Sequence, residues 1–202
     1  MSRDSLYKEY NLESGKILEI HYDESPESPR EWDNLGTVWC SHKRYSLSDK
    51  HAPKIDTDDH DGWDAVEQHL IKEEGAVVIL PIYMHDHSGI TISTKPFGDR
   101  WDSGQVGFIY CTGAKIKADY NVKRITKQIK ERVTACLEGE IKTYDQYVTG
   151  DVYGFKLMQF DITTKERVEE DACWGFYGDD FEKNGILDHL GKNDVILKER
   201  CE

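Results

Sequence analysis

The amphipathic pattern that sets the fold class lies in residues 122–147, VKRITKQIKERVTACLEGEIKTYDQY. Isoleucine, valine or leucine recurs there every fourth residue, at positions 125, 129, 133, 137 and 141. Apolar side chains at this spacing share one face of an α-helix. We therefore expect one long helix, ended by Gly150, whose apolar face packs on a sheet.

Apolar segments on both sides of this helix predict the strands of that sheet. Alternating or continuous apolar residues indicate strands at residues 16–23, 37–40, 76–84, 90–94, 105–112, 151–162 and 172–177. Shorter helices are expected at 63–74 and 179–190, and the polar residues 41–62 predict a surface excursion. Strands that cluster around a helix indicate an α+β fold. We expect a mostly antiparallel sheet packed against one long amphipathic helix, in a single compact domain over residues 1–202.

Composition and charge exclude several classes of protein. The chain has 202 residues, a net charge of −13 and 11% aromatic residues. A protein this acidic is not expected to bind DNA or an anionic membrane through its net charge. It has no apolar run long enough to span a bilayer, and its first residues lack the apolar region of a secretory signal, so we expect a cytoplasmic protein. Five cysteines without close pairing are expected to be reduced thiols.

Charge is distributed unevenly along the chain. Residues 56–74 carry eight acidic residues against one lysine, and residues 115–132 carry seven basic residues against two acidic ones. Each segment is either a solvated face or a surface that meets a partner of opposite charge. An EF-hand is excluded, because the loop around Gly62 lacks the required Asp and Glu at its two ends. The candidate partner-binding residues are Asp56, Asp58, Asp59, Asp61 and Asp64.

Two histidines suggest a metal site. On an extended chain His85 and His87 point to the same side, and two imidazoles with a carboxylate form a typical site for a first-row metal. Asp102 and Glu31 lie in turn-rich segments that contain tryptophan, and they are the carboxylates we nominate. The alternative is that the histidines lie at a hairpin tip and bond to backbone or water. A divalent metal is thus the one cofactor that the sequence suggests, and otherwise we expect none.

Two loops rich in tryptophan and charged residues form a candidate polar cluster. Arg30, Trp32 and Asp33 follow a proline in residues 28–36, and Trp101 lies in a similar turn. Such a loop is either a structural latch or part of a binding site. The chain has no phosphate-binding loop, dinucleotide motif, nucleophile elbow or zinc-protease motif. The sequence leaves open whether the protein is an enzyme and favours the answer that it is not.

Five segments in chain order carry a resemblance to a known family. They are ESPREWDNLG (27–36), LPIYMHDHSGITIST (80–94), WDSGQVGFIY (101–110), YDQYVTGDVYGF (144–155) and CWGFYG (173–178). Through them the chain resembles a widespread family of small uncharacterised proteins of bacteriophages and mobile elements. The resemblance implies an accessory role in a phage or mobile element and no particular mechanism.

Three functions follow as hypotheses. The first is an acidic interaction protein that inhibits a host defence or a nucleic-acid enzyme, with a host protein as its partner and the acidic residues 56–74 as the contact. The alternative is a metal-dependent hydrolase or nuclease that uses His85 and His87 with Asp102 or Glu31 to activate water. The second alternative is a structural or regulatory phage protein without catalysis.

Overall fold

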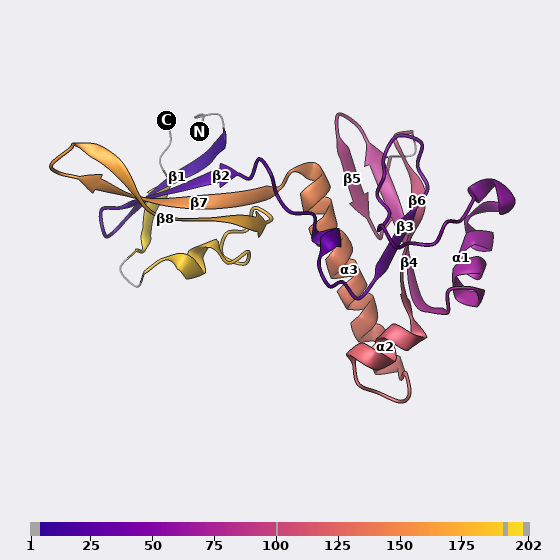
Figure 1. Ribbon diagram of the computed structural model, residues 1–202. Helices are drawn as coiled ribbons and strands as arrows, with labels where there is room; N and C mark the ends of the chain where they lie inside the picture. The colour runs from indigo at the N-terminus through magenta and orange to yellow at the C-terminus, as the bar shows by residue number, and fades with distance from the viewer. Residues whose placement is uncertain (1–4, 100, 192–193, 200–202) are drawn as a thin grey trace. The chain divides into compact units, whose positions relative to one another are not determined.

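The computed structural model of the chain describes residues 5–99, 101–191 and 194–199. These residues form two compact units, each with its own antiparallel sheet (Figure 1). Unit 1 combines the residues up to 27 with those from 146 onward, and unit 2 comprises residues 28–145. The predicted α+β class with antiparallel strands is confirmed. The single domain over residues 1–202 stays a prediction.

Unit 2 contains a four-stranded sheet in the order β3–β6–β4–β5, with every neighbouring pair antiparallel. The strands are β3 (Thr37–Cys40), β4 (Ala76–Asp86), β5 (Ile90–Ser93) and β6 (Ser103–Thr112). All four lie within two residues of the ranges expected from the apolar pattern. Strands β4 and β5 form the expected hairpin, whose tip carries the two histidines at 85 and 87.

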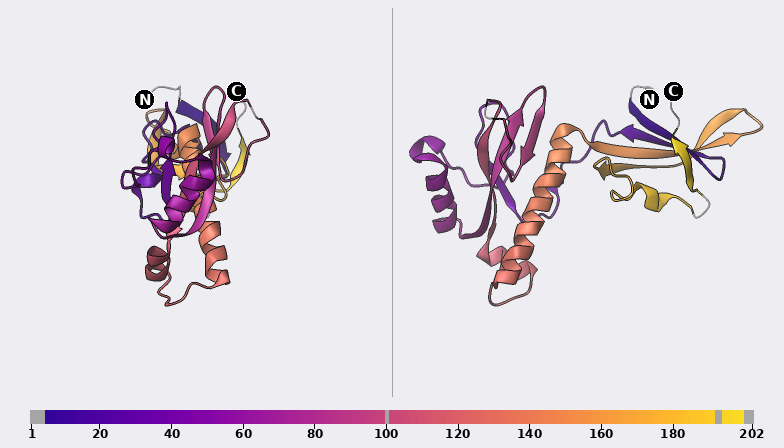
Figure 2. Two further views of the ribbon diagram at one scale, coloured as in Figure 1. Left: turned by 90° about the vertical axis from the view of Figure 1, so that its right-hand side faces the viewer. Right: turned by 180° about the vertical axis from the view of Figure 1, so that it is seen from behind.

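Helix α1 (Gly62–Lys72) covers one face of this sheet. Its Val66 and Leu70 are buried in a cluster with Trp39 of β3 and Phe108 of β6. Figures 1 and 2 show α1 and α3 on opposite sides of the sheet. Cover on both faces explains why six consecutive residues of β6 are buried, since a strand in a middle layer has no solvated side.

Helix α3 (Lys127–Thr149) is the long helix expected from the apolar spacing, and it packs on the other face of the sheet. A Cβ atom added to Gly36 would lie 2.5 Å from a Leu137 side-chain atom and 2.7 Å from the Ile109 side chain. The helix therefore presses the loop before β3 closely against the sheet. Gly150 follows the helix with a φ of +77°, the left-handed conformation that commonly ends a helix.

Unit 1 contains a five-stranded sheet in the order β8–β7–β2–β1–β9. Its strands are β1 (Leu6–Leu12), β2 (Ile17–Tyr22), β7 (Val152–Asp161), β8 (Glu166–Tyr177) and β9 (Ile196–Glu199). Leu18 pairs with Leu157 and Ile20 with Phe155 across β2 and β7, so their side chains share one face. These four residues form the core of the unit together with the fully buried Ile186.

The structure differs from the sequence-based expectation in several elements. Strands β1 and β9 and helix α2 (Gly113–Asp119) were not expected. Helix α2 buries only Ile116, so it has no apolar stripe that a periodicity could reveal. Strand β8 begins at residue 166 and not at 172. The earlier start was not predicted because the first six residues of the strand are exposed and lack apolar alternation.

The predicted helix at residues 179–190 is wrong. Only a short 3-10 turn, Ile186–His189, forms there. Gly185 precedes this turn with a φ of +98°, a conformation that interrupts an α-helix. The long helix begins at Lys127 and not at residue 122, after a turn in which Asn121 has a φ of +49°. Among the helices described, none is long and apolar enough to cross a membrane.

Candidate functional site

The tip of the β4–β5 hairpin lies against the loop that leads into β6. His85 pairs in register with Ser103, and the Asp86 amide donates to the Asp102 carbonyl at 2.8 Å. These contacts hold His85 and His87 beside Asp102. We call His85, His87, Asp99 and Asp102 the hairpin cluster.

The four side chains of the hairpin cluster approach one another. His85 Nε2 lies 3.7 Å from Asp99 Oδ2, and His87 Nδ1 lies 3.1 Å from Asp102 Oδ2. The two imidazole rings stack with centroids 6.0 Å apart and planes at 24°. Single ligand atoms of His85, Asp99 and Asp102 all lie within 4.8 Å of one another. This spacing suits three ligands of one metal ion.

Asp99 holds its own loop while it faces His85. Its Oδ1 accepts a hydrogen bond from the Trp101 amide at 2.9 Å, and the Ser103 hydroxyl donates to its carbonyl. The bond from the Trp101 amide is the main cause that lowers the pKa of Asp99, and the charge of His85 lowers it further. The carboxylate is thus stabilised in its ionised form, with Oδ2 directed towards the imidazole.

The structure brings together three of the four nominated metal ligands, His85, His87 and Asp102. Glu31 is separate from them, since its carboxylate forms an ion pair with Lys50 at 2.8 Å. Asp99 takes the place that we assigned to Glu31. One signal in the sequence could have identified Asp99. It lies three residues before Asp102 in the same glycine-containing turn, so the two carboxylates belong to one loop.

The five aspartates of residues 56–64, the acidic segment, lie at the start of two short helical elements and are all exposed. Asp56 caps the 3-10 turn Thr57–Asp59 by accepting from the Asp58 amide at 3.0 Å. Asp61 occupies the N-cap position of α1, and Asp64 lies in its first turn. Acidic residues are favourable at helix N-termini, so part of this charge stabilises the fold locally.

The acidic segment has no cationic partner within the described residues. None of its five carboxylates forms an ion pair with a described lysine, arginine or histidine. His60 lies within the segment, but its ring bonds to the Asp56 carbonyl and to His69. The segment therefore presents uncompensated negative charge to solvent.

The polar loop cluster separates into a buried part and an exposed part. The Arg30 side chain is only 7% exposed, and it donates two bonds to Asp49 at 2.8 Å, one to Glu140 at 2.9 Å and one to the Gly36 carbonyl at 2.8 Å. Trp32 is 44% exposed and Trp101 is 96% exposed. Asp33 is also exposed. The four predicted residues do not form one cluster.

Arg30, Asp49 and Glu140 form a saturated network with little exposure, which we call the Arg30 network. Asp49 accepts from the Val38 amide at 2.9 Å, and Glu140 accepts from the Leu35 amide at 2.7 Å. Burial acts to lower the pKa of Arg30, but the bonds to Asp49 and Glu140 outweigh it and raise the pKa. The network ties the loop, the polar excursion and α3 together, which makes it a structural latch.

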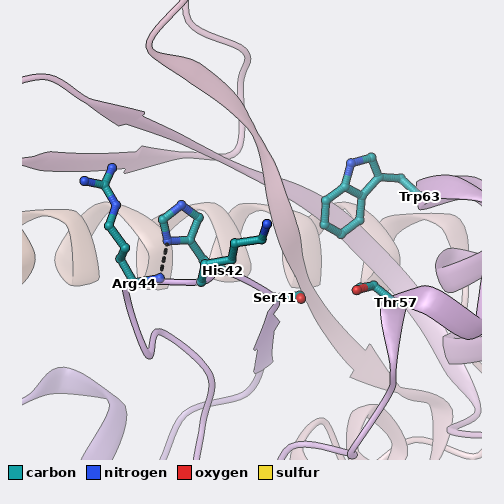
Figure 3. Close-up of a pocket in the computed structure, with 6 residues that line it drawn as sticks. Ser41, His42, Arg44, Thr57 and Trp63 are labelled. Atoms are coloured by element: carbon teal, nitrogen blue, oxygen red, sulfur yellow. Dashed lines mark hydrogen bonds between the residues drawn. The ribbon is translucent and has the colours of Figure 1, made fainter.

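A pocket of about 580 Å³ lies beside the acidic segment (Figure 3). Figure 3 shows Trp63 and Thr57 on one side of it and His42 and Arg44 on the other. Arg44 also forms an ion pair with Asp86 of the hairpin. A lining that combines arginine, lysine and tryptophan suits an anionic or aromatic group. Six residues line the pocket: Ser41, His42, Lys43, Arg44, Thr57 and Trp63.

Unit 1 holds a polar network that the sequence did not suggest. His21 bonds to the Ser5 hydroxyl and to Glu19, each at 3.2 Å. Arg167 bonds to Glu19 at 3.0 Å and to Glu9 at 2.7 Å. A hydroxyl, an imidazole and a carboxylate in this order occur in nucleophilic enzymes. Because Arg167 holds the carboxylate from the other side, we interpret the network as a clamp across β1, β2 and β8.

The described cysteines are free thiols. Burial raises the pKa of Cys40 to about 12 and that of Cys111 to about 11. Both thiols therefore stay protonated at neutral pH, which makes them poor nucleophiles. Cys136 is exposed, and Cys201 lies outside the described residues.

Comparison of the chain with family models, with curated proteins and with solved structures finds no match. A functional assignment therefore depends on the charged groups themselves. Among the charged groups of unit 2 that lie outside the Arg30 network and reach solvent are the acidic segment, the hairpin cluster and the basic residues of 115–132.

Proposed function

We propose that this protein is a non-catalytic interaction protein that inhibits a host enzyme, with the acidic segment as its contact surface. The proposal agrees with the accessory role implied by the resemblance to phage and mobile-element proteins. It also agrees with the net charge of −13, which favours cationic partners.

The observation that carries the proposal is the unpaired state of the segment. Asp56, Asp58, Asp59, Asp61 and Asp64 are exposed, and no described cation neutralises them. Five like charges within nine residues repel one another, so the free protein gains little from this arrangement. A cationic partner would relieve the repulsion.

The geometry of the segment favours a folded partner with a basic groove. The 3-10 turn and the first turn of α1 fix the backbone of the aspartates, which lowers the conformational entropy lost on binding. Grooves that bind nucleic acid are lined with lysine and arginine, because phosphate contacts dominate their affinity. An acidic segment that occupies such a groove competes directly with DNA or RNA. We therefore place a nucleic-acid enzyme of the host defence as the first candidate partner.

The test is a phage-plating assay in a host with a defence system that targets nucleic acid. The variant carries Asp56→Asn, Asp58→Asn, Asp59→Asn and Asp61→Asn, since asparagine keeps the capping acceptor and removes the charge. We expect the wild-type protein to restore plating and the variant to lose most of that effect. Equal activity of the variant and the wild type would contradict the proposal, as would a wild-type protein without effect.

A matched control separates the position of the charge from its amount. Glu13, Glu24, Asp179 and Glu182 are exposed acidic residues of unit 1. Their replacement by the corresponding amides changes the net charge as much as the variant does. We expect this control to retain inhibition, and both proteins must show the thermal unfolding midpoint of the wild type within a few degrees.

The hairpin cluster favours a second candidate function, a metal-dependent hydrolase or nuclease. His85, Asp99 and Asp102 offer a ligand set for an ion that could activate water. Cleavage of a phosphodiester that depends on added Mn²⁺ or Zn²⁺ and disappears with Asp99→Asn would support this function. A non-catalytic structural or regulatory phage protein is the third candidate, and it predicts neither inhibition nor cleavage.

A further inference from the structure

The hairpin cluster has the spacing of a metal site. Nitrogen and oxygen ligands lie about 2.0–2.2 Å from a first-row metal ion, so two ligands of one ion lie roughly 3–4.4 Å apart. The ligand atoms of His85, Asp99 and Asp102 lie within 4.8 Å of one another without an ion. This limit lies close to the spacing of ligands that share one ion.

We propose that His85, Asp99 and Asp102 bind one divalent first-row metal ion and that His87 orients Asp102. This inference is independent of the inhibitor proposal, because the site uses none of the five aspartates of the acidic segment.

The backbone around the site is held before any ion binds. The bond from the Asp86 amide to the Asp102 carbonyl fixes the loop to the end of β4. Asp99 is held by the Trp101 amide through Oδ1, which leaves Oδ2 directed at His85. His85 lies on β4, whereas Asp99 and Asp102 lie in the loop before β6, where these hydrogen bonds restrict them. Ligands that are already restricted lose less entropy when they coordinate an ion.

His87 supports a ligand and does not coordinate the ion itself. It lies 3.1 Å from Asp102 and its ring stacks on that of His85. Hydrogen bonds to a ligating carboxylate commonly contribute a factor of about 10 to 100 to metal affinity. The His87 side chain is 69% exposed, and its Nδ1 faces Asp102. In this role, His87 Nδ1–H donates a hydrogen bond to the Asp102 carboxylate.

The donor set determines the kind of metal. One imidazole and two carboxylates suit manganese, cobalt, nickel or zinc, whereas calcium and magnesium prefer oxygen ligands alone. Among these, affinity is expected to rise from manganese to nickel along the usual order for divalent ions. Three protein ligands leave further coordination positions for water.

The test is a titration of chelator-treated protein without a histidine tag, with Co²⁺ followed by visible absorption and Zn²⁺ followed by calorimetry. We expect one equivalent of each ion to bind the wild-type protein. The double variant Asp99→Asn with Asp102→Asn should bind roughly 100-fold more weakly, and His87→Gln should weaken binding about 10-fold.

Two control variants test whether the ion binds at another histidine pair or responds only to net charge. His60 and His69 have ring nitrogens 3.3 Å apart, so the variant His60→Gln with His69→Gln removes that pair. The variant Asp179→Asn with Glu182→Gln removes the same charge as the site variant at an exposed position in unit 1. Both controls should bind the metal about as tightly as the wild type.

Loss of binding in Asp99→Asn with Asp102→Asn, together with its retention in both controls, supports the site. Three results would overturn it: binding by this variant that equals the wild type, loss of binding in the His60 and His69 variant, or no stoichiometric binding by the wild type. If the double variant does not fold, His85→Gln is the second site variant, since it removes one ligand and leaves the bond from the Trp101 amide to Asp99 in place.

Discussion

The Arg30 network and the acidic segment both concentrate carboxylates in unit 2, yet they have opposite surroundings. In the network, Asp49 and Glu140 have little exposure and each accepts bonds from Arg30 and from backbone amides. In the acidic segment, five aspartates are exposed and no described cation pairs with them. The difference teaches that residue type alone does not distinguish a carboxylate that stabilises the fold from one that is available to a partner. Burial and the number of satisfied hydrogen bonds distinguish them.

The largest effect is expected from Arg30→Ala. This change leaves two largely buried carboxylates without their cation, and breaking a buried ion pair costs about 3–5 kcal/mol. The measurement is the free energy of unfolding in urea. The control is Arg44→Ala, whose side chain is 68% exposed and pairs with Asp86. It should cost less than about 1 kcal/mol, and similar losses for both variants would contradict the distinction.

A smaller effect is expected from Glu140→Gln. Glutamine keeps the shape of the side chain, but it weakens the bonds to Arg30 and to the Leu35 amide, which we expect to cost about 2 kcal/mol. Glu138→Gln on the same helix is the control, since Glu138 is exposed. Equal unfolding free energies for the two variants would show that the network does not stabilise unit 2.

A still smaller effect on stability is expected when Asp56, Asp58, Asp59 and Asp61 become asparagine. The change removes repulsion between like charges and also a favourable interaction with the start of α1, each worth a few tenths of a kcal/mol. The free energy of unfolding should stay within about 1 kcal/mol of the wild type. A loss as large as that of Arg30→Ala would place the segment among the structural charges.

The smallest change concerns thiol reactivity. Burial is the main cause of the raised pKa of Cys40, about 12, and Asp49 of the Arg30 network contributes. At a pH of about 8, we expect a disulfide reagent to modify the exposed Cys136 faster than the partly buried Cys40, although burial and Glu140 raise the pKa of Cys136 as well. In Arg30→Ala, modification of Cys40 should become faster as the network loosens. Modification of Cys40 as fast as that of Cys136 in the wild type would contradict this order.

Local patterns predicted much of unit 2. Apolar residues at every fourth position identified α3, and continuous apolar runs identified β4 and β6, because both signals depend on neighbours along the chain. The first strand of unit 1, β1, was missed, and all six of its residues before Leu12 are only partly buried. Strands β2 and β7 and part of β8 were predicted, but their separate sheet was not, because it pairs residues 17–22 with residues 153–158 far along the chain.

The sites were predicted less completely, for a physical reason. His85, His87 and Asp102 could be nominated from their spacing, but Asp99 replaces Glu31 because the fold brings the loop before β6 to the hairpin. Arg30 meets Asp49 at a sequence separation of 19 residues and Glu140 at 110. No local pattern encodes such pairs. The acidic segment could be identified from its composition alone. The structure then showed that no described cation pairs with its aspartates.

The most direct test of the acidic contact is hydrogen–deuterium exchange of the protein alone and in complex with the enzyme that it inhibits. The account predicts slower exchange of backbone amides in residues 57–70 in the complex, since the partner covers the 3-10 turn and the start of α1. Protection confined to other residues, with unchanged exchange in residues 57–70, would contradict it.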